Sequence, residues 1–296
     1  MKNLMNLKKE LNFEKNSIFT SKSNVLKLLK KQIKLSQIEK ILDFTVEDWQ
    51  KNKNKILAQI VTDFPNKKVI IRSSAIGEDS AKNSEAGSYE SILNINSNSK
   101  AQLISAINHV INSYKEKNNL NKNNQILVQT QILDIISSGV IFTRTSDLAS
   151  PYYVINYEEG KSTVGVTRGS VNETVKISRY SNNKILTKKW NLLLSAVKEI
   201  QSIIPSDSLD IEFGITQNNA VVIFQVRPMT SFQKLKTKKF DLSIKTEINK
   251  NQKKFLKLKN ANRLYGNFLI FSDMTDWNPA EIIGNNPRPL DYSLYN

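Results

Sequence analysis

Residues 209–226 constrain the fold more than any other part of the chain, because they predict a β-hairpin with two unlike faces. Residues 209–215 and 220–226 have the alternating pattern of strands, and Asn218 and Asn219 between them predict a two-residue type I′ turn. One face of this hairpin is apolar and is expected to pack against a core. That face carries Ile211, Phe213, Val222, Phe224 and Val226.

The opposite face of the predicted hairpin is polar. With a two-residue turn, Glu212 lies directly opposite Gln225, and Asp210 lies directly opposite Arg227. A carboxylate beside an amide oxygen on a rigid sheet can hold Mg²⁺, and an adjacent arginine can neutralise a phosphoryl group. The same four residues could instead form a solvated polar set with an ordinary Asp–Arg pair. The residues alone leave both interpretations open.

The remaining pattern mixes helices with short, mostly antiparallel strands, which favours an α+β fold over a doubly wound parallel sheet. Residues 1–60 are predicted to be mainly helical, and further helices are predicted at 101–114 and 190–204. His109 lies off the apolar stripe of the helix at 101–114 and is expected to be exposed. The stripe comprises Leu103, Ile107, Val110 and Tyr114. Strands are predicted at 69–71, 126–128, 140–142 and 152–155, with turns at 137–139 and 150–151.

Composition excludes several classes of site. The 296-residue chain has no cysteine, so disulfides, cysteine-ligated metals and thiol nucleophiles are excluded. His109 is the only histidine, which argues against a multi-histidine metal site and a Ser-His-Asp triad. No apolar run is long enough for a membrane span, and the lysine-rich N-terminus lacks the apolar segment of a secretory signal. These features fit a cytoplasmic protein, and no membrane partner is expected.

The net charge of +16 is unevenly distributed. Residues 231–263 carry ten lysines and Arg263 against only Asp241 and Glu247. Because few aromatic residues are interleaved with these lysines, we interpret residues 231–264 as a solvated linker or helix. A basic nucleic-acid binder is the alternative, but no nucleic acid is expected as a partner.

Arginine is rare, with seven arginines against 36 lysines, so each arginine marks a place where a planar, bidentate fork is useful. Arg72 and Arg227 draw attention because each ends a strand-like run. The familiar phosphate motifs are absent: Gly160 to Ser162 resembles the end of a P-loop, but Ile155 stands where the first glycine is required. The loop after Arg72 is rich in serine and glycine, and it could cradle a phosphate or be an ordinary turn.

Three blocks of the sequence resemble the ATP-binding domain shared by phosphoenolpyruvate synthase, pyruvate phosphate dikinase and rifampicin phosphotransferase, an ATP-grasp fold. The blocks are residues 69–95, 126–143 and 210–230, in the order and spacing of that family. The tail at 271–295 contains Asp-Trp-Asn-Pro-Ala-Glu and resembles the L-glutamine kinase of capsular phosphoramidate biosynthesis. The resemblance implies an ATP-grasp domain at 1–230 and the beginning of an incomplete substrate-side domain at 265–296.

The resemblance also implies that ATP and Mg²⁺ are the cofactors and gives roles to the hairpin residues. Glu212 and Gln225 match the family's metal-coordinating pair, in agreement with the hairpin pairing. Arg72 and Arg227 match the arginines that grip the ATP phosphates, and they are the candidate catalytic residues.

Four further residues match nucleotide-binding positions of the family. Lys22 stands where the family has a lysine after two glycines, but Thr20 and Ser21 replace those glycines. Gly87 and Ser91 match the loop that closes over the phosphates, and Gln129 matches the end of the strand beside the adenine.

The implied reaction is of the dikinase type. Terminal phosphates of ATP pass to a histidine on a separate domain, AMP and phosphate are released, and the histidine phosphorylates a small-molecule acceptor, here the amide of L-glutamine. Since His109 is placed on a helix of the nucleotide unit, the carrier is expected on a phosphohistidine domain, in cis in a longer chain or in trans. Alternatives are a phosphoenolpyruvate synthase-like enzyme, an antibiotic phosphotransferase and a non-catalytic ATP-binding module.

Overall fold

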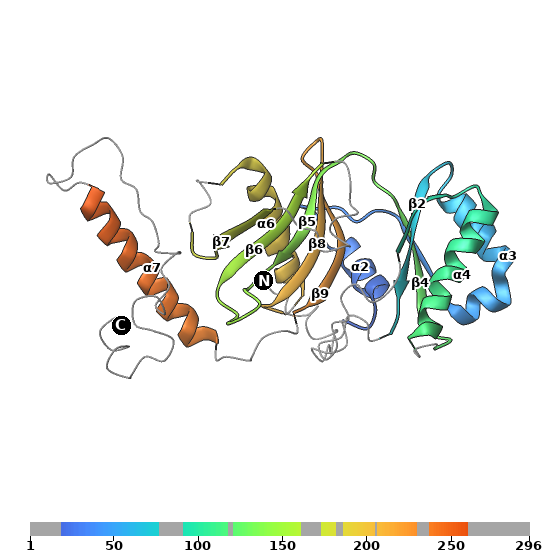
Figure 1. Ribbon diagram of the computed structural model, residues 1–296, viewed down its shortest axis with the longest axis horizontal. Helices are drawn as coiled ribbons and strands as arrows, with labels where there is room; N and C mark the ends of the chain where they lie inside the picture. The colour runs from blue at the N-terminus through green and yellow to red at the C-terminus, as the bar shows by residue number, and fades with distance from the viewer. Residues whose placement is uncertain are drawn as a thin grey trace, which may run out of the picture. The chain divides into compact units, whose positions relative to one another are not determined.

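A computed structural model describes residues 19–76, 91–117, 121–160, 173–181, 186–204, 206–229 and 237–259 (Figure 1). The chain divides into two units, Met1–Ser243 and Ile244–Asn296. The strands of the described ranges all belong to the first unit, and helix α7 (Thr237–Lys259) runs from the first unit into the second. Within those ranges, no helix combines the length and the apolar character needed to cross a membrane.

The first sheet is antiparallel, with the strand order β1-β4-β2-β3. Helices α3 (Val46–Asp63) and α4 (Lys100–Glu116) pack on one of its faces, where Val69, Ile71 and Val128 are buried (Figure 1). Because side chains alternate along a strand, Arg72 faces away from these helices. The strands are β1 (Ile41–Thr45), β2 (Lys68–Ser74), β3 (Ser91–Asn96) and β4 (Gln125–Thr130).

The second sheet is also antiparallel, with the strand order β7-β6-β5-β8-β9. Helix α6 (Lys188–Ile203) covers one face, and its buried residues Leu193 and Val197 share a core with Ile211 and Phe213 of the sheet (Figure 1). Helix α2 (Lys22–Lys30) contributes to the same core and contacts both β9 and β1. The strands are β5 (Ile135–Phe142), β6 (Tyr152–Glu159), β7 (Glu173–Ser178), β8 (Leu209–Thr216) and β9 (Val221–Pro228).

The β8–β9 hairpin confirms the predicted pairs but not the predicted turn. The backbone N–H of Thr216 donates to the carbonyl of Ala220 at 3.0 Å, so the loop has three residues, 217–219, and Asn219 adopts a φ of 61°. Loops of this length commonly place one residue in the left-handed region. A bulge at Phe224 then adds one residue to β9, because Glu212 pairs with Gln225 while Phe213 pairs with Ile223.

The bulge also changes which side chains reach the core. Ile211, Phe213 and Val226 belong to the core, as predicted. Val222, by contrast, pairs with Gly214, which shares the face of Glu212, so its predicted position on the core face is wrong. The prediction for Phe224 is wrong as well, because its ring lies over Gly214, where an added Cβ would approach within 2.7 Å of its Cζ.

Two other sequence predictions are corrected by tertiary pairing. Residues 41–45, predicted to be part of a mainly helical region, form strand β1 because they pair with β4. Residues 137–139, predicted as a turn, lie inside β5, where Gly139 is required by the close approach of β6: a Cβ there would meet the Asn156 carbonyl oxygen at 2.2 Å. The helix at 101–114 is confirmed, with its stripe fully buried and His109 exposed.

Candidate functional site

Arg72 lies near the end of β2, and its guanidinium connects the two sheets of the first unit. The Nη2 atom donates to Glu212 Oε2 at 3.0 Å and to Gln225 Oε1 at 3.2 Å, and Nη1 donates to the Phe224 carbonyl at 3.2 Å. The Arg72 side chain is only 8% exposed, so these contacts are largely protected from water. Folding therefore brings together three of the residues selected from the sequence.

Glu212 and Gln225 lie side by side because β8 and β9 pair at this position. Burial alone would raise the pKa of Glu212, but the attraction of Arg72, Lys22 and Arg227 outweighs that effect and holds the pKa below its ordinary value. The carboxylate is therefore ionised at neutral pH and stands beside an amide oxygen.

This donor pair fits Mg²⁺, which prefers oxygen ligands and usually combines one or two protein oxygens with substrate phosphates and water. Within the described ranges, no group of three or more His, Cys, Asp or Glu side chains could hold a metal ion. A metal held by Glu212 and Gln225 would therefore take its remaining ligands from a nucleotide and from water.

Arg227 and Asp210 form the neighbouring pair on the same face of the hairpin. Arg227 Nε donates to Asp210 Oδ2 at 2.7 Å, which sets the direction of the guanidinium plane. Burial raises the pKa of Asp210 to about 6, although Arg227 acts in the opposite direction. The other carboxylate oxygen, Oδ1, is buried and accepts no hydrogen bond from the part of the protein that the structure describes.

Lys22 is the first residue of α2, and the start of that helix is tied to the first sheet. Ser21 Oγ donates to Gln125 Oε1 at 2.6 Å, and the backbone N–H of Ser23 donates to Ser74 Oγ at 3.0 Å. Lys22 itself helps to lower the pKa of Glu212, so its ammonium acts on the same site. The replacement of two family glycines by Thr20 and Ser21 therefore still leaves Lys22 near the candidate site.

The other proposed nucleotide-binding residues are placed by the first sheet. Ser91 begins β3 and pairs with Arg72, so both lie on the same face. Gln129 in β4 pairs with Ile70, which shares that face with Arg72. The Gln129 side chain is buried, and neither of its amide atoms has a hydrogen-bond partner within the described ranges. Gly87 lies outside the described residues.

Two contacts that position Arg72 and the start of α2 were missed by sequence reasoning. The Phe224 carbonyl is available to Arg72 in the bulged stretch of β9, and no residue type in the sequence signals this bulge. The Ser23–Ser74 contact joins residues 51 positions apart, and only the fold brings them together.

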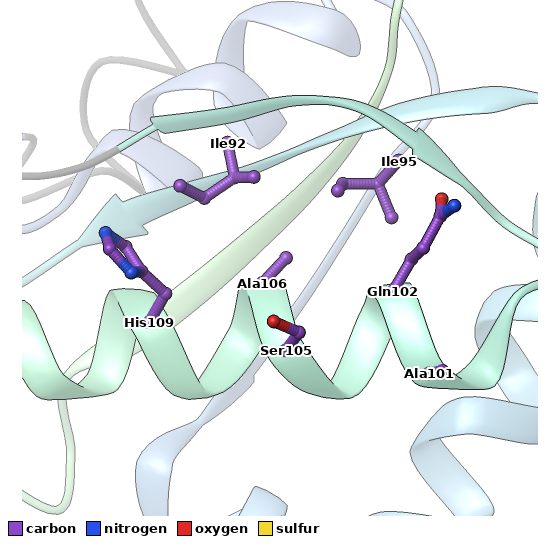
Figure 2. Close-up of a pocket in the computed structure, with 7 residues that line it drawn as sticks. All are labelled: Ile92, Ile95, Ala101, Gln102, Ser105, Ala106 and His109. Carbon is purple, nitrogen blue, oxygen red and sulfur yellow. The ribbon is translucent and has the colours of Figure 1, made fainter.

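A separate open pocket of about 430 Å³ lies on the helix-covered side of the first sheet. Figure 2 shows Ile92 and Ile95 on β3 opposite Gln102, Ala106 and His109 on α4. Because Arg72 faces away from α4, this pocket is distinct from the Arg72 site. His109 therefore belongs to the opposite side of the sheet from the candidate site.

One protein family matches more than half of the chain. The family described as "Pyruvate phosphate dikinase, AMP/ATP-binding domain" matches residues 6–157, which include Lys22, Arg72, Ser91 and Gln129 but not the β8–β9 hairpin. No curated protein matches the chain.

Solved structures with a similar chain trace include two D-alanine-D-alanine ligases and a synthetase. The Helicobacter pylori ligase is 12% identical with a TM-score of 0.39, covering 72% of this chain and 52% of its own. The Coxiella burnetii ligase is 9% identical with a TM-score of 0.42, covering 74% and 50%. N5-carboxyaminoimidazole synthetase from Staphylococcus aureus is 13% identical with a TM-score of 0.41, covering 72% and 46%. The chain thus spans about half the length of these structures.

Proposed function

The chain belongs to the pyruvate phosphate dikinase AMP/ATP-binding domain family, and from this membership we propose that it is the nucleotide-binding part of a dikinase-type phosphotransferase. Its fold is the α+β, ATP-grasp-like fold that the resemblance predicts, with two antiparallel sheets and helices packed on them. The observation that carries the proposal is the buried contact of Arg72 with Glu212 and Gln225, which joins the matched region to the hairpin.

The proposed site binds ATP mainly by charge neutralisation and positioning. Arg72 and Arg227 would hold the phosphates, since both present planar guanidinium forks from strands that the sheets fix in place. Glu212 and Gln225 would hold Mg²⁺, which neutralises phosphate charge when bound. Gln129 would meet the adenine, because a buried amide that lacks partners is stabilised by a ligand edge with a donor and an acceptor.

The proposed reaction converts ATP, water and an acceptor into AMP, phosphate and a phosphorylated acceptor, through a histidine on a phosphohistidine domain supplied in cis or in trans. We propose the side-chain amide of L-glutamine as the acceptor. The support for this acceptor is the sequence likeness of the tail at 271–295, which lies outside the described residues. A non-catalytic ATP-binding module is a second candidate, favoured by the exposed position of the only histidine, His109, on α4.

Nucleotide binding is tested by isothermal titration of the purified chain with Mg·ATP. The wild-type chain should bind, and Glu212→Ala should lose most of the affinity because the ionised oxygen beside Gln225 is removed. Glu159→Ala is the matched control. Glu159 is an exposed glutamate at the end of β6, and its ion pair is with Lys189 of α6. Equal affinity in wild type and Glu212→Ala would contradict the proposed site.

The acceptor is tested separately from the binding of ATP. The chain would be mixed with a phosphohistidine domain of a dikinase, and AMP release would be followed with L-glutamine or with pyruvate. AMP release that depends on glutamine supports the proposed acceptor. AMP release that depends on pyruvate would show that pyruvate, not glutamine, is the acceptor. Binding of ATP without AMP release under either condition would favour the non-catalytic module.

A further inference from the structure

Ser138 on β5 and Glu158 on β6 are directly paired on the face of the second sheet that carries Glu212. Two observations place them on that face. Ser138 also pairs with Gly214 on β8, and Gly214 lies two residues from Glu212 along the same strand. The side chains of Ser138, Glu158 and Glu212 therefore point to the same side of the sheet, opposite the side that packs on α6.

Both side chains have a buried polar atom without a partner. Ser138 is 1% exposed, and its Oγ has no hydrogen bond within the described ranges. The same holds for Glu158 Oε1, and Glu158 forms no ion pair with any residue of those ranges. Most buried polar atoms in proteins are satisfied, because leaving one unpaired destabilises the fold, and more so when the atom is charged. Two such atoms on adjacent strands indicate a ligand that brings hydrogen-bond donors.

The position of the pair along the sheet indicates which part of a ligand reaches it. Three successive levels along β8 carry paired residues on this face. The first is Asp210 with Arg227, the second is Glu212 with Gln225, and the third is Gly214 with Ser138. Successive levels are two residues, or about 7 Å, apart. A nucleotide whose terminal phosphates lie at Arg227 and whose metal lies at Glu212 would present its sugar at the next level.

The surroundings of Gly214 favour a sugar over another phosphate. Gly214 has no side chain, and Ile135 and Phe224 fill the space above it, where an added Cβ would lie 2.7 Å from atoms of both. The β8 side of this level is therefore apolar and closed, which leaves the β5 and β6 side, with Ser138 and Glu158, for a ligand. This apolar neighbourhood contains no described arginine or lysine at the same level of β5, β8 or β9. A carboxylate there repels phosphate but accepts hydrogen bonds from hydroxyl groups.

We propose that Ser138 and Glu158 bind the ribose hydroxyls of the nucleotide. The hydroxyls donate to Glu158 Oε1, and Ser138 Oγ accepts from or donates to the neighbouring hydroxyl. This assignment rests on the proposed function, because it takes the phosphate and metal ends of the nucleotide as its reference. It makes the pair a determinant of selectivity for ribonucleotides over deoxyribonucleotides.

Titration calorimetry of the full chain with Mg²⁺ and ATP, 2′-deoxy-ATP or 3′-deoxy-ATP tests the assignment. A hydrogen bond to a charged group contributes about 1.5–3 kcal/mol, so the wild-type chain should bind at least one deoxy analogue roughly tenfold or more weakly than ATP. In Glu158→Ala this discrimination should fall to less than about threefold. In Ser138→Ala the discrimination should fall for the deoxy analogue that lacks the hydroxyl contacted by Ser138. Glu159→Ala, on the opposite face, should keep the wild-type ratios.

The outcomes distinguish a failure of the hydroxyl site from a failure of the proposed function. If ATP binding depends on Glu212 but the wild-type chain binds all three nucleotides within twofold, the hydroxyl site is wrong and the proposed function stands. If Glu158→Ala weakens all three nucleotides equally, the residue does not read the hydroxyls. If the wild-type chain binds none of them, the proposed function and the hydroxyl site both fail.

Discussion

Arg72→Met removes the guanidinium that joins the two sheets and keeps an unbranched apolar stem. The wild-type side chain makes three hydrogen bonds, one of them to the ionised carboxylate of Glu212. All three bonds are charge-assisted because the guanidinium is ionised; one such bond contributes about 1.5–3 kcal/mol and the three are not additive, so the loss should be about 3–5 kcal/mol. Removing one partner of a buried ion pair costs about the same amount, because the other charge stays buried.

Urea unfolding of the variants, followed by circular dichroism, measures this loss as a change in the free energy of unfolding. The double variant Arg72→Met with Glu212→Leu should recover part of the stability, because no buried charge remains unpaired. Lys40→Met is the matched control: Lys40 pairs with Asp63 at 2.7 Å, but its side chain is 50% exposed, so the loss should be about 1 kcal/mol or less. If Arg72→Met costs no more than the control, Arg72 does not hold the sheets together.

Three further predictions follow from the same site. Arg227→Lys should weaken Mg·ATP binding in titration although it keeps the charge, because a lysine cannot form the fork that Asp210 orients through Nε; equal affinities would count against the assignment. Gln225→Ala should raise the Mg²⁺ concentration needed for a thermal shift with ATP by about tenfold, and an unchanged requirement would favour an ordinary polar pair. The chain alone should be stabilised by about 2.7 kcal/mol when Mg·ATP is a hundredfold above Kd. It should nevertheless release no AMP in a glutamine-dependent manner, and turnover at about 1 per second or faster would refute the need for a separate histidine.

Much of the secondary structure could be predicted because periodicity is a local property of the chain. The buried stripe of α4 and the exposed position of His109 follow from helical spacing alone. The scarcity of arginine was equally informative. In the described ranges the chain has Arg72, Arg144, Arg179 and Arg227, and each forms an ion pair with a carboxylate. Arginine is therefore used here where a fixed fork meets an acid, while lysine serves the surface.

The hairpin shows how a correct pairing came from an incorrect turn. A two-residue loop without a bulge and a three-residue loop with a bulge at Phe224 both place Glu212 opposite Gln225. The alternation of polar and apolar residues could not distinguish them, because the bulge changes the faces only of the residues between it and the loop. Val222 and Phe224 were misplaced for that reason.

The sequence by itself determined which residues can carry the chemistry. They are one carboxylate and one amide that face each other on a strand pair, Glu212 and Gln225, and two arginines at strand ends. The sequence also excluded cysteine chemistry and a second histidine. Only the tertiary structure decided that Arg72 meets Glu212, 140 residues away. It also decided that Gln129, Ser138 and Glu158 keep buried polar atoms that find no partner among the described residues. The physical reason is the distance along the chain over which each interaction acts. Alternation and turn chemistry act over a few residues, whereas contacts between the sheets depend on the packing of both cores and on the bulge that sets how β9 presents its carbonyl to Arg72.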